Sequence, residues 1–364
     1  MIKSILEQSG KKVGLIGTIT NIIGSRKVPS ERTTPESPDL QRLFHDMFRE
    51  GVEAVVMEVS SHSLALERVA GCSYEIGVFT NLTQDHLDFH GTLENYRNAK
   101  AKLFQQSRLA VINVDDESGR IILEGLEGKA FTYGIHKPAD IFARDIEITA
   151  EGVSFNLHIL GGKIGVNLHI PGLFSVYNAL AAASSCYAAG ASLKDIQNGL
   201  ESMRGVPGRF ELLDTGTEYS VILDYAHTPD GLENILKTAR DLTEGRIVTL
   251  FGCGGDRDAA KRPIMGEIAG RYSDFCIVTT DNPRNEEPMA IINDILPGLQ
   301  KTGCPYKVIE NRREAIEHAL KTGRKNDVII LAGKGHETYQ LIKGRTFHFD
   351  EKEIVAEILG REKV

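Results

Sequence analysis

The sequence predicts an α/β protein built from two consecutive, mostly parallel, doubly wound domains. Short apolar runs, typical of buried strands, alternate with helical stretches along the chain. The alternation is interrupted at residues 203–209, where two glycines and a proline follow a helical segment. The chain has 364 residues, which is long for a single core. We therefore expect one domain at residues 1–205 and a second at residues 206–364.

The first domain opens on a helical pattern. Met1, Ile2, Ile5 and Leu6 share one face over residues 1–9, and Gly10 supplies a helix end. No strand precedes this helix, so we expect the domain to lack its first strand. Further strands are predicted at 13–16, 54–59, 76–79 and 109–114, and helices at 39–50, 93–104, 177–189 and from Ser192 onward. A short antiparallel section is predicted near 140–170, with strands at 146–150, 153–160 and 165–170.

The second domain repeats the alternation of strand and helix. Strands are predicted at 221–223, 247–251, 275–279, 306–309 and 328–331, with helices between them. One of these helices is expected to begin at Pro229, because proline is favoured in the first helical turn.

Composition excludes several classes of protein. A net charge of -8 argues against nucleic acid as the main partner. Five cysteines without a CxxC pair indicate scattered thiols in a reducing compartment. No apolar run is long enough to span a membrane, and the N-terminus lacks the features of a signal peptide. We expect a cytoplasmic protein with no membrane span.

Two polar clusters follow predicted strands of the first domain, where ligands of doubly wound sheets bind. The first is Glu58-Val-Ser-Ser-His62, in which Ser60 or Ser61 could instead be a helix N-cap beside a solvated glutamate. The second, residues 81–90, holds Asn81, two aspartates and two histidines. These could bind Mg²⁺ or Mn²⁺, or could form a polar turn.

Lys100 lies on a predicted helix. Helical phase places it near one face with Leu93, Tyr96, Leu103 and Phe104, so the side chain is expected to point inward. The alternative is an ordinary solvated lysine. Among apolar residues its pKa would fall, and the amine could act as a nucleophile, for instance toward CO₂.

Four polar loops follow strands of the second domain and are expected at one edge of one sheet. They are residues 224–230, 251–258, 281–284 and 332–337. Any one of them could be a plain turn, but together they favour a binding site. Arg257, Arg284 and Lys334 offer donors for carboxylates, whereas Asp281 and Glu337 suit an ammonium group. This mixture predicts an amino-acid ligand.

Ordered motifs over nearly the whole chain resemble the Mur ligase family. In the central domain they are 30–36, 58–62, 81–90 and 99–100, and in the C-terminal domain 224–230, 254–258, 281–284 and 333–337. Within the family, Asp281-Asn-Pro-Arg284 resembles the pattern for meso-diaminopimelate. The resemblance implies an ATP- and Mg²⁺-dependent ligase of peptidoglycan precursor synthesis. It would add meso-2,6-diaminopimelate to UDP-N-acetylmuramoyl-L-alanyl-D-glutamate through an acyl-phosphate intermediate, as a monomer.

The resemblance also implies residue roles. By resemblance, Thr33, Thr34, Ser60 and Arg68 would contact the UDP-muramyl dipeptide. Leu66 replaces a glutamine that some relatives use for this contact. Mg²⁺ ligands fall on Glu58, His86 and Lys100, the last as a carbamate, and these three form the catalytic set. Nucleotide contacts fall on Asn178, Arg209 and Asp224. The diaminopimelate pocket falls on Arg257, Asp281, Asn282, Pro283, Arg284, Gly333 and Glu337.

One departure concerns phosphate binding. Mur ligases have an N-terminal UDP-binding domain and a glycine-rich phosphate loop ahead of the helix that begins here at Met1. Residues 14–18 and 24–27 lack the G-x-x-x-x-G-K-[ST] pattern that cradles the β- and γ-phosphates. We therefore expect this polypeptide by itself to ligate poorly or not at all. ADP release by the purified protein at the rate of a full-length relative would contradict this expectation.

Other functions stay open. The chain could be a non-catalytic remnant that binds diaminopimelate or a partner protein. It could also be another ligase of the Mur superfamily, such as a lysine-adding or folylpolyglutamate synthase-like enzyme, although residues 281–284 speak against both. The hypothesis of a nicotinamide dehydrogenase is supported only by the glycine cluster at residues 252–255.

Overall fold

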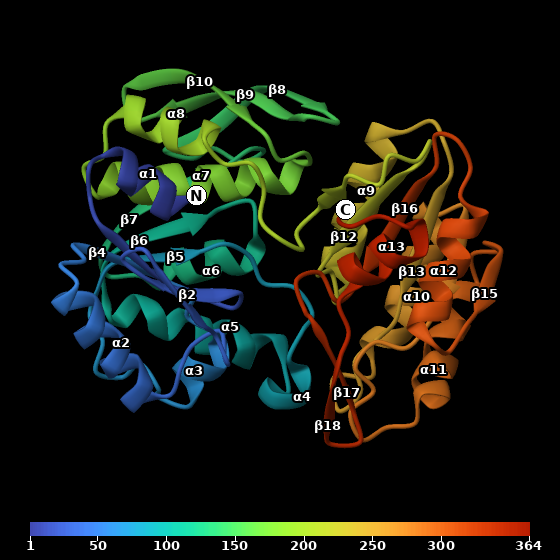
Figure 1. The fold of residues 1–364 in the computed structure, drawn as a ribbon. Helices are drawn as coiled ribbons and strands as arrows, with labels where there is room; N and C mark the ends of the chain where they lie inside the picture. Colours follow the sequence, from blue (N-terminus) through green and yellow to red (C-terminus); the bar gives the residue numbers. More distant parts are fainter. The chain divides into compact units, whose positions relative to one another are not determined.

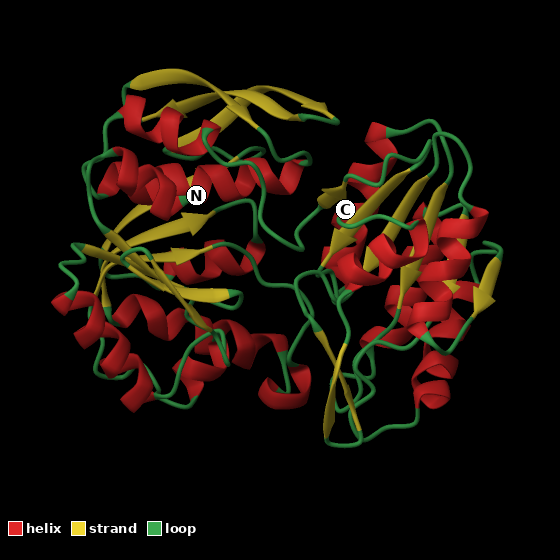
Figure 2. Ribbon diagram, in the orientation of Figure 1, coloured by secondary structure: helices red, strands yellow, loops and turns green.

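The computed structural model describes all 364 residues, which form two compact units (Figure 1). The first unit comprises Met1–Leu82 and His90–Arg204, and the second comprises Thr83–Phe89 and Gly205–Val364. In each unit helices pack on sheets (Figure 2), which confirms the predicted α/β class. No helix combines the length and the apolar composition needed to cross a membrane.

The first unit contains a four-stranded sheet in the order β3-β2-β1-β4. β1 (Val13–Ile16) pairs in parallel with β4 (Ala54–Met57), but β2 (Thr20–Ile23) and β3 (Arg26–Pro29) add antiparallel pairings. This sheet is therefore mostly antiparallel, unlike the prediction for the domain. The hairpin turns at Gly24, where φ is +61°, a conformation that glycine adopts without a steric penalty.

The second sheet of this unit has six strands in the order β10-β9-β8-β7-β6-β5. β5 to β8 run parallel, whereas β8, β9 and β10 pair antiparallel, as predicted for residues 140–170. The strands are β5 (Tyr74–Phe79), β6 (Ser107–Asn113), β7 (Lys129–Gly134), β8 (Ile141–Thr149), β9 (Gly152–Ile159) and β10 (Gly162–Leu168). The helices are α1 (Ile2–Gln8), α2 (Ser37–Arg49), α3 (Ser61–Ala65), α5 (Leu93–Gln105), α6 (Glu117–Glu124), α7 (Leu173–Ala188) and α8 (Leu193–Glu201), whereas the short α4 (Leu87–His90) groups with the second unit except for its last residue.

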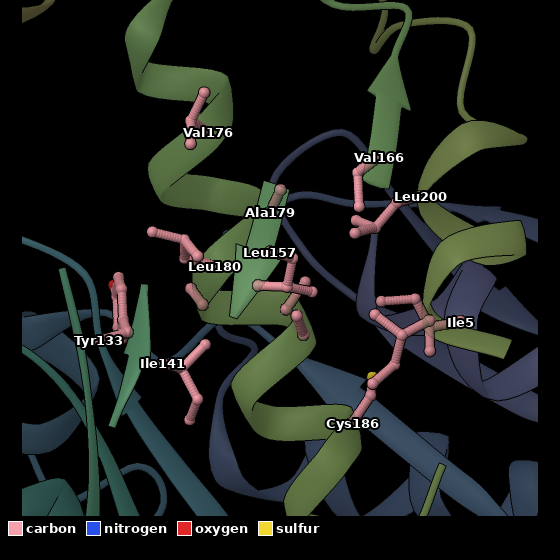
Figure 3. Packing of buried hydrophobic residues seen from close by; sticks show 14 of the residues in the cluster. Ile5, Tyr133, Ile141, Leu157, Val166, Val176, Ala179, Leu180, Cys186 and Leu200 are labelled. Carbon is pink, nitrogen blue, oxygen red and sulfur yellow. The ribbon is translucent and has the colours of Figure 1, made fainter. Parts of the chain in front are cut away.

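Helix α7 is central to the core of the first unit (Figure 3). Its alanines allow close packing, and Val176, Ala179 and Leu180 belong to the same buried cluster as Ile141 and Leu157 of the sheet. The helix begins four residues earlier than residue 177, the predicted start, because it is entered at Gly172, where φ is +91°. α8 begins after Ser192, whose side chain forms a capping box with Asp195.

Asp115 fixes the loop after β7. Its carboxylate accepts hydrogen bonds from the backbone N–H groups of Ile135, His136 and Lys137 and from the Tyr177 hydroxyl. Burial opposes ionisation, but these hydrogen bonds together hold the pKa of Asp115 below its ordinary value.

Replacing Asp115 by asparagine should therefore flatten the pH dependence of stability in acid. The folded pKa lies below the unfolded value of about 3.9, so the carboxylate stabilises the fold above that pH. This stabilisation is lost as the pH falls through the folded pKa. Urea midpoints followed by circular dichroism should fall less steeply for the variant below about pH 4. Glu127→Gln, at an exposed carboxylate, is the control, and an unchanged slope for Asp115→Asn would contradict the prediction.

The second unit is built on a six-stranded sheet in the order β11-β12-β16-β13-β14-β15, parallel except for β11. Its strands are β11 (Glu211–Leu213), β12 (Ser220–Asp224), β13 (Ile247–Phe251), β14 (Phe275–Val278), β15 (Tyr306–Val308) and β16 (Val328–Ala332). Its helices are α9 (Pro229–Leu242), α10 (Lys261–Tyr272), α11 (Pro288–Gln300), α12 (Arg312–Thr322) and α13 (Glu351–Leu359). All five predicted strands of this domain are present, β11 is an additional strand, and α9 begins at Pro229 as expected.

Two further features of this unit were not predicted. A hairpin of β17 (Tyr339–Ile342) and β18 (Arg345–His348) stands apart from the sheet (Figure 1). Cys276 and Cys304, 28 residues apart in the sequence, have sulfur atoms 3.9 Å apart. The five cysteines are therefore not all isolated from one another, although none is in a disulfide.

Candidate functional site

Glu58 follows β4, at the carboxyl end of the strand. Its Oε2 accepts a hydrogen bond of 2.6 Å from the Thr18 hydroxyl. Thr34 is buried, donates to the carbonyl oxygen of Glu58 and accepts from the backbone N–H of Ser60. The Ser60 hydroxyl caps α3 by accepting from the N–H of Ser63, which is the structural role left open by the sequence. Thr34 and Ser60 thus shape the loop that presents Glu58.

The other predicted contacts to the muramyl peptide are Thr33 and Arg68, with Leu66 at the position of a glutamine in some relatives. Thr33 shares a hydrogen bond with Thr18, at 3.0 Å between the two hydroxyl oxygens. The Arg68 guanidinium lies 3.1 Å from the Glu36 carboxylate. Leu66 ends α3 and is half exposed. Hydrogen bonding therefore links Thr33, Thr34 and Ser60 to the loops around Glu58, whereas Arg68 is held by the residue that precedes α2.

Lys100 points inward, as its helical phase predicted. Its Nζ lies 5.2 Å from the centre of the Tyr96 ring and 5.9 Å from that of Phe79, and donates to the carbonyl oxygen of Asn81. Leu93 was predicted on the same buried face but is 47% exposed, because it is the first residue of α5. The surroundings of Lys100 are aromatic on one side and polar on the other.

His86 belongs to a segment that groups with the second unit, whereas Glu58 and Lys100 belong to the first. Next to it, Asp85 lies 3.5 Å from the ammonium group of Lys261, a side chain only 5% exposed, and 3.9 Å from the His227 ring. Burial opposes ionisation of Asp85, but Lys261 and the two histidines lower its pKa. No group of three or more His, Cys, Asp or Glu side chains is gathered as a metal site.

The four polar loops of the second unit do lie at one edge of one sheet. They follow β12, β16, β13 and β14, which are neighbouring parallel strands, so their carboxyl ends meet. Glycines bring the loops together. Gly255 donates to the Asn282 carbonyl oxygen and leaves no room for a side chain beside the Pro283 carbonyl. At Gly333, φ is +112° and a Cβ would lie 2.7 Å from Asp281 Oδ2.

The cationic side of this edge is formed by two arginines. Arg284 is half-buried with φ of +52°, and its Nη1 donates to the Gly255 carbonyl oxygen at 2.8 Å. Arg257 is exposed on the neighbouring loop. Burial, and then the positive charge of Arg257, lower the pKa of Arg284. An anion placed between the two guanidinium groups would relieve this repulsion.

The acidic side is formed by Asp281 and Glu337. Asp281 is 7% exposed, and its Oδ1 accepts from the N–H of Asn282, while the buried Oδ2 has no hydrogen-bond partner. Glu337 accepts a hydrogen bond from Asn282 Nδ2. Lys334, which we expected to offer a donor to a carboxylate, is instead fully buried and paired with Glu337. That expectation was wrong because a local motif does not reveal whether a lysine faces the ligand or the core.

The predicted nucleotide contacts are divided between the units. Asn178 is exposed on α7 of the first unit. In the second, the Arg209 guanidinium stacks 4.8 Å from the Tyr225 ring centre. Both oxygens of Asp224 accept backbone N–H groups, from Phe210 and Ala226. Burial raises the pKa of Asp224, and these hydrogen bonds oppose the shift only in part.

Sequence reasoning missed two supports of this sheet edge. From the β17–β18 hairpin, Gln340 donates to the Asp281 carbonyl oxygen and the Leu341 N–H to Asn282 Oδ1. The turn at Lys343-Gly344, with apolar and polar residues alternating around it, could have indicated this hairpin. Arg262 is 3% exposed and pairs with Glu286, which accepts from the N–H of Asp256. No local pattern distinguishes this arginine from a surface residue.

The fold and the site define a class of protein, and comparison with known families gives the same class. Residues 1–186 match the Mur ligase middle domain, and residues 208–335 match the family described as Mur ligase, glutamate ligase domain. The chain belongs to the Mur ligase family.

Within that family, the chain is similar to UDP-N-acetylmuramoyl-L-alanyl-D-glutamate–2,6-diaminopimelate ligases. It is 54% identical to the one from Clostridium tetani, over 99% of this chain and 74% of that protein. The enzyme of that name from Caldanaerobacter subterraneus subsp. tengcongensis is also 54% identical, over 100% and 75%. A solved structure of such a ligase is 35% identical, with a TM-score of 0.67, covering 99% of this chain and 74% of that one.

The fold extends to more distant proteins. Mycobacterium tuberculosis folylpolyglutamate synthase is 16% identical, with a TM-score of 0.71, covering 100% of this chain and 88% of that one. At this identity the likeness concerns the fold alone.

Proposed function

We propose that the protein is an ATP-dependent ligase that joins meso-2,6-diaminopimelate to UDP-N-acetylmuramoyl-L-alanyl-D-glutamate in peptidoglycan precursor synthesis. Similarity to ligases of that name over 99% of the chain supports this assignment. The observation that carries it is the sheet edge where Arg284 and Arg257 face Asp281 and Glu337. We propose that it acts as a cytoplasmic monomer.

The pocket fits an amino acid with two zwitterionic ends. Arg284, with Arg257 beside it, would hold the carboxylate of the end that does not react, because guanidinium groups match carboxylates in geometry and charge. Asp281 Oδ2, buried without a partner, and Glu337 would hold the ammonium group of the same end. L-Lysine lacks this carboxylate and would leave Arg284 unpaired, which is the physical reason for selectivity.

The proposed reaction has two steps. The D-glutamyl γ-carboxylate oxygen forms a bond to the γ-phosphorus of ATP, and ADP leaves, which gives an acyl phosphate. The free amine of diaminopimelate then attacks the acyl carbon, phosphate leaves with the bonding electron pair, and the nitrogen loses a proton. By holding the distal end of the amino acid, the pocket would fix the position of the attacking amine.

The remaining predicted residues are proposed to bind the other substrates. Asn178, Arg209 and Asp224 would contact ATP, and Thr33, Thr34, Ser60 and Arg68 would contact the muramyl dipeptide. Mg²⁺ would be held by Glu58, His86 and a carbamate on Lys100. Oxygen donors suit this ion, and the Glu58 carboxylate is oriented by a hydroxyl rather than paired with a cation. When bound, Mg²⁺ would offset the repulsion between carboxylate and triphosphate.

Calorimetry and a ligation assay test the proposal. The protein should bind meso-diaminopimelate at least about tenfold more tightly than L-lysine, a difference of about 1.4 kcal/mol. Equal or no binding of the two would contradict the proposed substrate. In the ligation assay, with ATP, Mg²⁺ and the muramyl dipeptide, mass spectrometry should detect the tripeptide product.

A second candidate is a non-catalytic protein that binds diaminopimelate. The observation that favours it is that Arg257, Asp281, Arg284 and Glu337 all lie within the second unit, so binding of the amino acid could occur without the first. Binding of meso-diaminopimelate without any product in the ligation assay, and without binding of ATP, would support this candidate over the ligase.

A further inference from the structure

Lys334 is a buried cation to which the proposed reaction gives no role. It lies between Gly333 and Gly335 after β16, and its side chain is 0% exposed. Burying an ammonium group is costly unless it is paired and hydrogen-bonded. Specific contacts with its neighbours must therefore compensate the charge of Lys334. A ligand that approaches from solvent cannot reach the ammonium group.

The partners of Lys334 all belong to the amino-acid pocket. Its Nζ donates to Glu337 Oε2 at 3.1 Å and to Asn282 Oδ1 at 3.2 Å. Asn282 Nδ2 in turn donates to the same Oε2 of Glu337 at 2.9 Å. The rings of Tyr339 and Phe349 lie 5.7 and 5.8 Å from the ammonium group, which places it among aromatic faces.

The two oxygens of Glu337 are consequently unequal. Oε2 accepts two hydrogen bonds of ordinary length, one of them from a cation. Oε1 faces only the hydroxyl groups of Tyr225 and Tyr339, at 3.3 and 3.5 Å. These contacts are long for O–H···O hydrogen bonds, which are about 2.7–2.8 Å when strong. Oε1 is thus the oxygen that keeps capacity for a charged donor.

We propose that Lys334 is a positioning residue, which with Asn282 holds Glu337 Oε2 so that Oε1 receives the ammonium group of the incoming amino acid. This inference rests on the proposed function of the pocket. Lys334 also offsets one of the two negative charges that Asp281 and Glu337 bring to the pocket. Without it, the Glu337 side chain would lose its fixed orientation, and two carboxylates would face each other with less compensation.

The test is a double-mutant cycle in the intact protein, measured by calorimetry. Lys334→Met and Glu337→Gln, alone and combined, are titrated with meso-diaminopimelate. They are also titrated with pimelate, which keeps both carboxylates and lacks both amino groups. Lys334→Met should weaken binding of meso-diaminopimelate about tenfold, as expected for a charge-assisted hydrogen bond, and that of pimelate less than about twofold. In the Glu337→Gln background, Lys334→Met should have little further effect.

Several results would overturn the inference. Equal losses for the two ligands, or additive losses in the cycle, would mean that Lys334 supports the fold rather than the orientation of Glu337. If Lys334→Met does not fold, Lys334→Gln, which retains a donor, takes its place, and unchanged discrimination between the ligands would count against the proposal. Lys343→Met, at an exposed lysine of the hairpin turn, is the matched control. Failure of the unmodified protein to bind meso-diaminopimelate would instead contradict the proposed function.

Discussion

Replacing Arg312 by methionine should lower the free energy of unfolding of the second unit by about 3–5 kcal/mol, the usual cost of leaving one member of a buried ion pair alone. Arg312 and Glu351 are 0% and 1% exposed, with 2.8 Å between Nε and Oε1. The arginine also donates to the Ala332 carbonyl oxygen, at the end of β16. The substitution would therefore leave the Glu351 carboxylate buried without its cationic partner. It would also remove a hydrogen bond that holds the start of the 333–337 loop.

The neighbouring residue provides a matched control. Arg313 also joins α12 to α13, through an ion pair of 2.7 Å with Glu357, but both side chains are at least half exposed. Arg313→Met should cost less than about 1 kcal/mol, since solvent screens the pair. Urea unfolding followed by circular dichroism suits a chain without tryptophan. Similar losses for the two variants would show that burial does not decide the strength of these pairs.

A third variant separates the ion pair from its surroundings. Arg312→Met combined with Glu351→Leu removes both charges and keeps much of the side-chain volume. It should recover a large part of the lost stability, because the cost in the single variant comes mainly from an uncompensated charge. A double variant as unstable as Arg312→Met would instead point to the hydrogen bond to Ala332 as the main contribution.

Replacing Arg284 by methionine should weaken binding of meso-diaminopimelate by about 2–3 kcal/mol, roughly 30- to 150-fold. Only one hydrogen bond, to Gly255, engages the guanidinium group within the protein, so its other donors face the proposed ligand carboxylate. Binding of L-lysine should change little, because it has no second carboxylate. Titration calorimetry of both ligands measures the difference.

Controls for Arg284 come from the same region. Arg345→Met changes an exposed arginine on β18 and should leave both affinities within about twofold. Equal weakening of meso-diaminopimelate and L-lysine by Arg284→Met would mean that the substitution disrupts the 281–284 loop, rather than removing a carboxylate contact. That outcome would remove Arg284 from the proposed basis of selectivity.

The sequence predicted the parts of the site that depend on local patterns. Strand-like runs followed by Asp224, Asp281 and Gly333 indicated loops at the carboxyl ends of parallel strands, and the sheet order places these loops side by side. The inward phase of Lys100 followed from helical spacing alone. Where two local interpretations of one residue were open, as at Ser60, the sequence did not choose, because N-cap serine and binding serine have the same local pattern.

Other features depended on residues far apart in the chain. The Thr83–Phe89 segment groups with the second unit, and Asp85 finds its cationic partner, Lys261, there. The β2–β3 hairpin makes one predicted parallel sheet mostly antiparallel. No periodicity or residue spacing in the sequence indicates either feature.

The sequence by itself determined the α/β class, the positions of five strands of the second unit along the chain and which loops hold the charged residues. These follow from local periodicity and from turn residues, which act over a few positions. Only the tertiary structure decided which charges lie in the loops with partners within the protein and which are buried. Lys334 meets Asn282 across 52 residues, and Arg312 meets Glu351 across 39. A buried charge is tolerated only when it has such a partner. Because the partners are far apart in the sequence, they meet only when the chain folds.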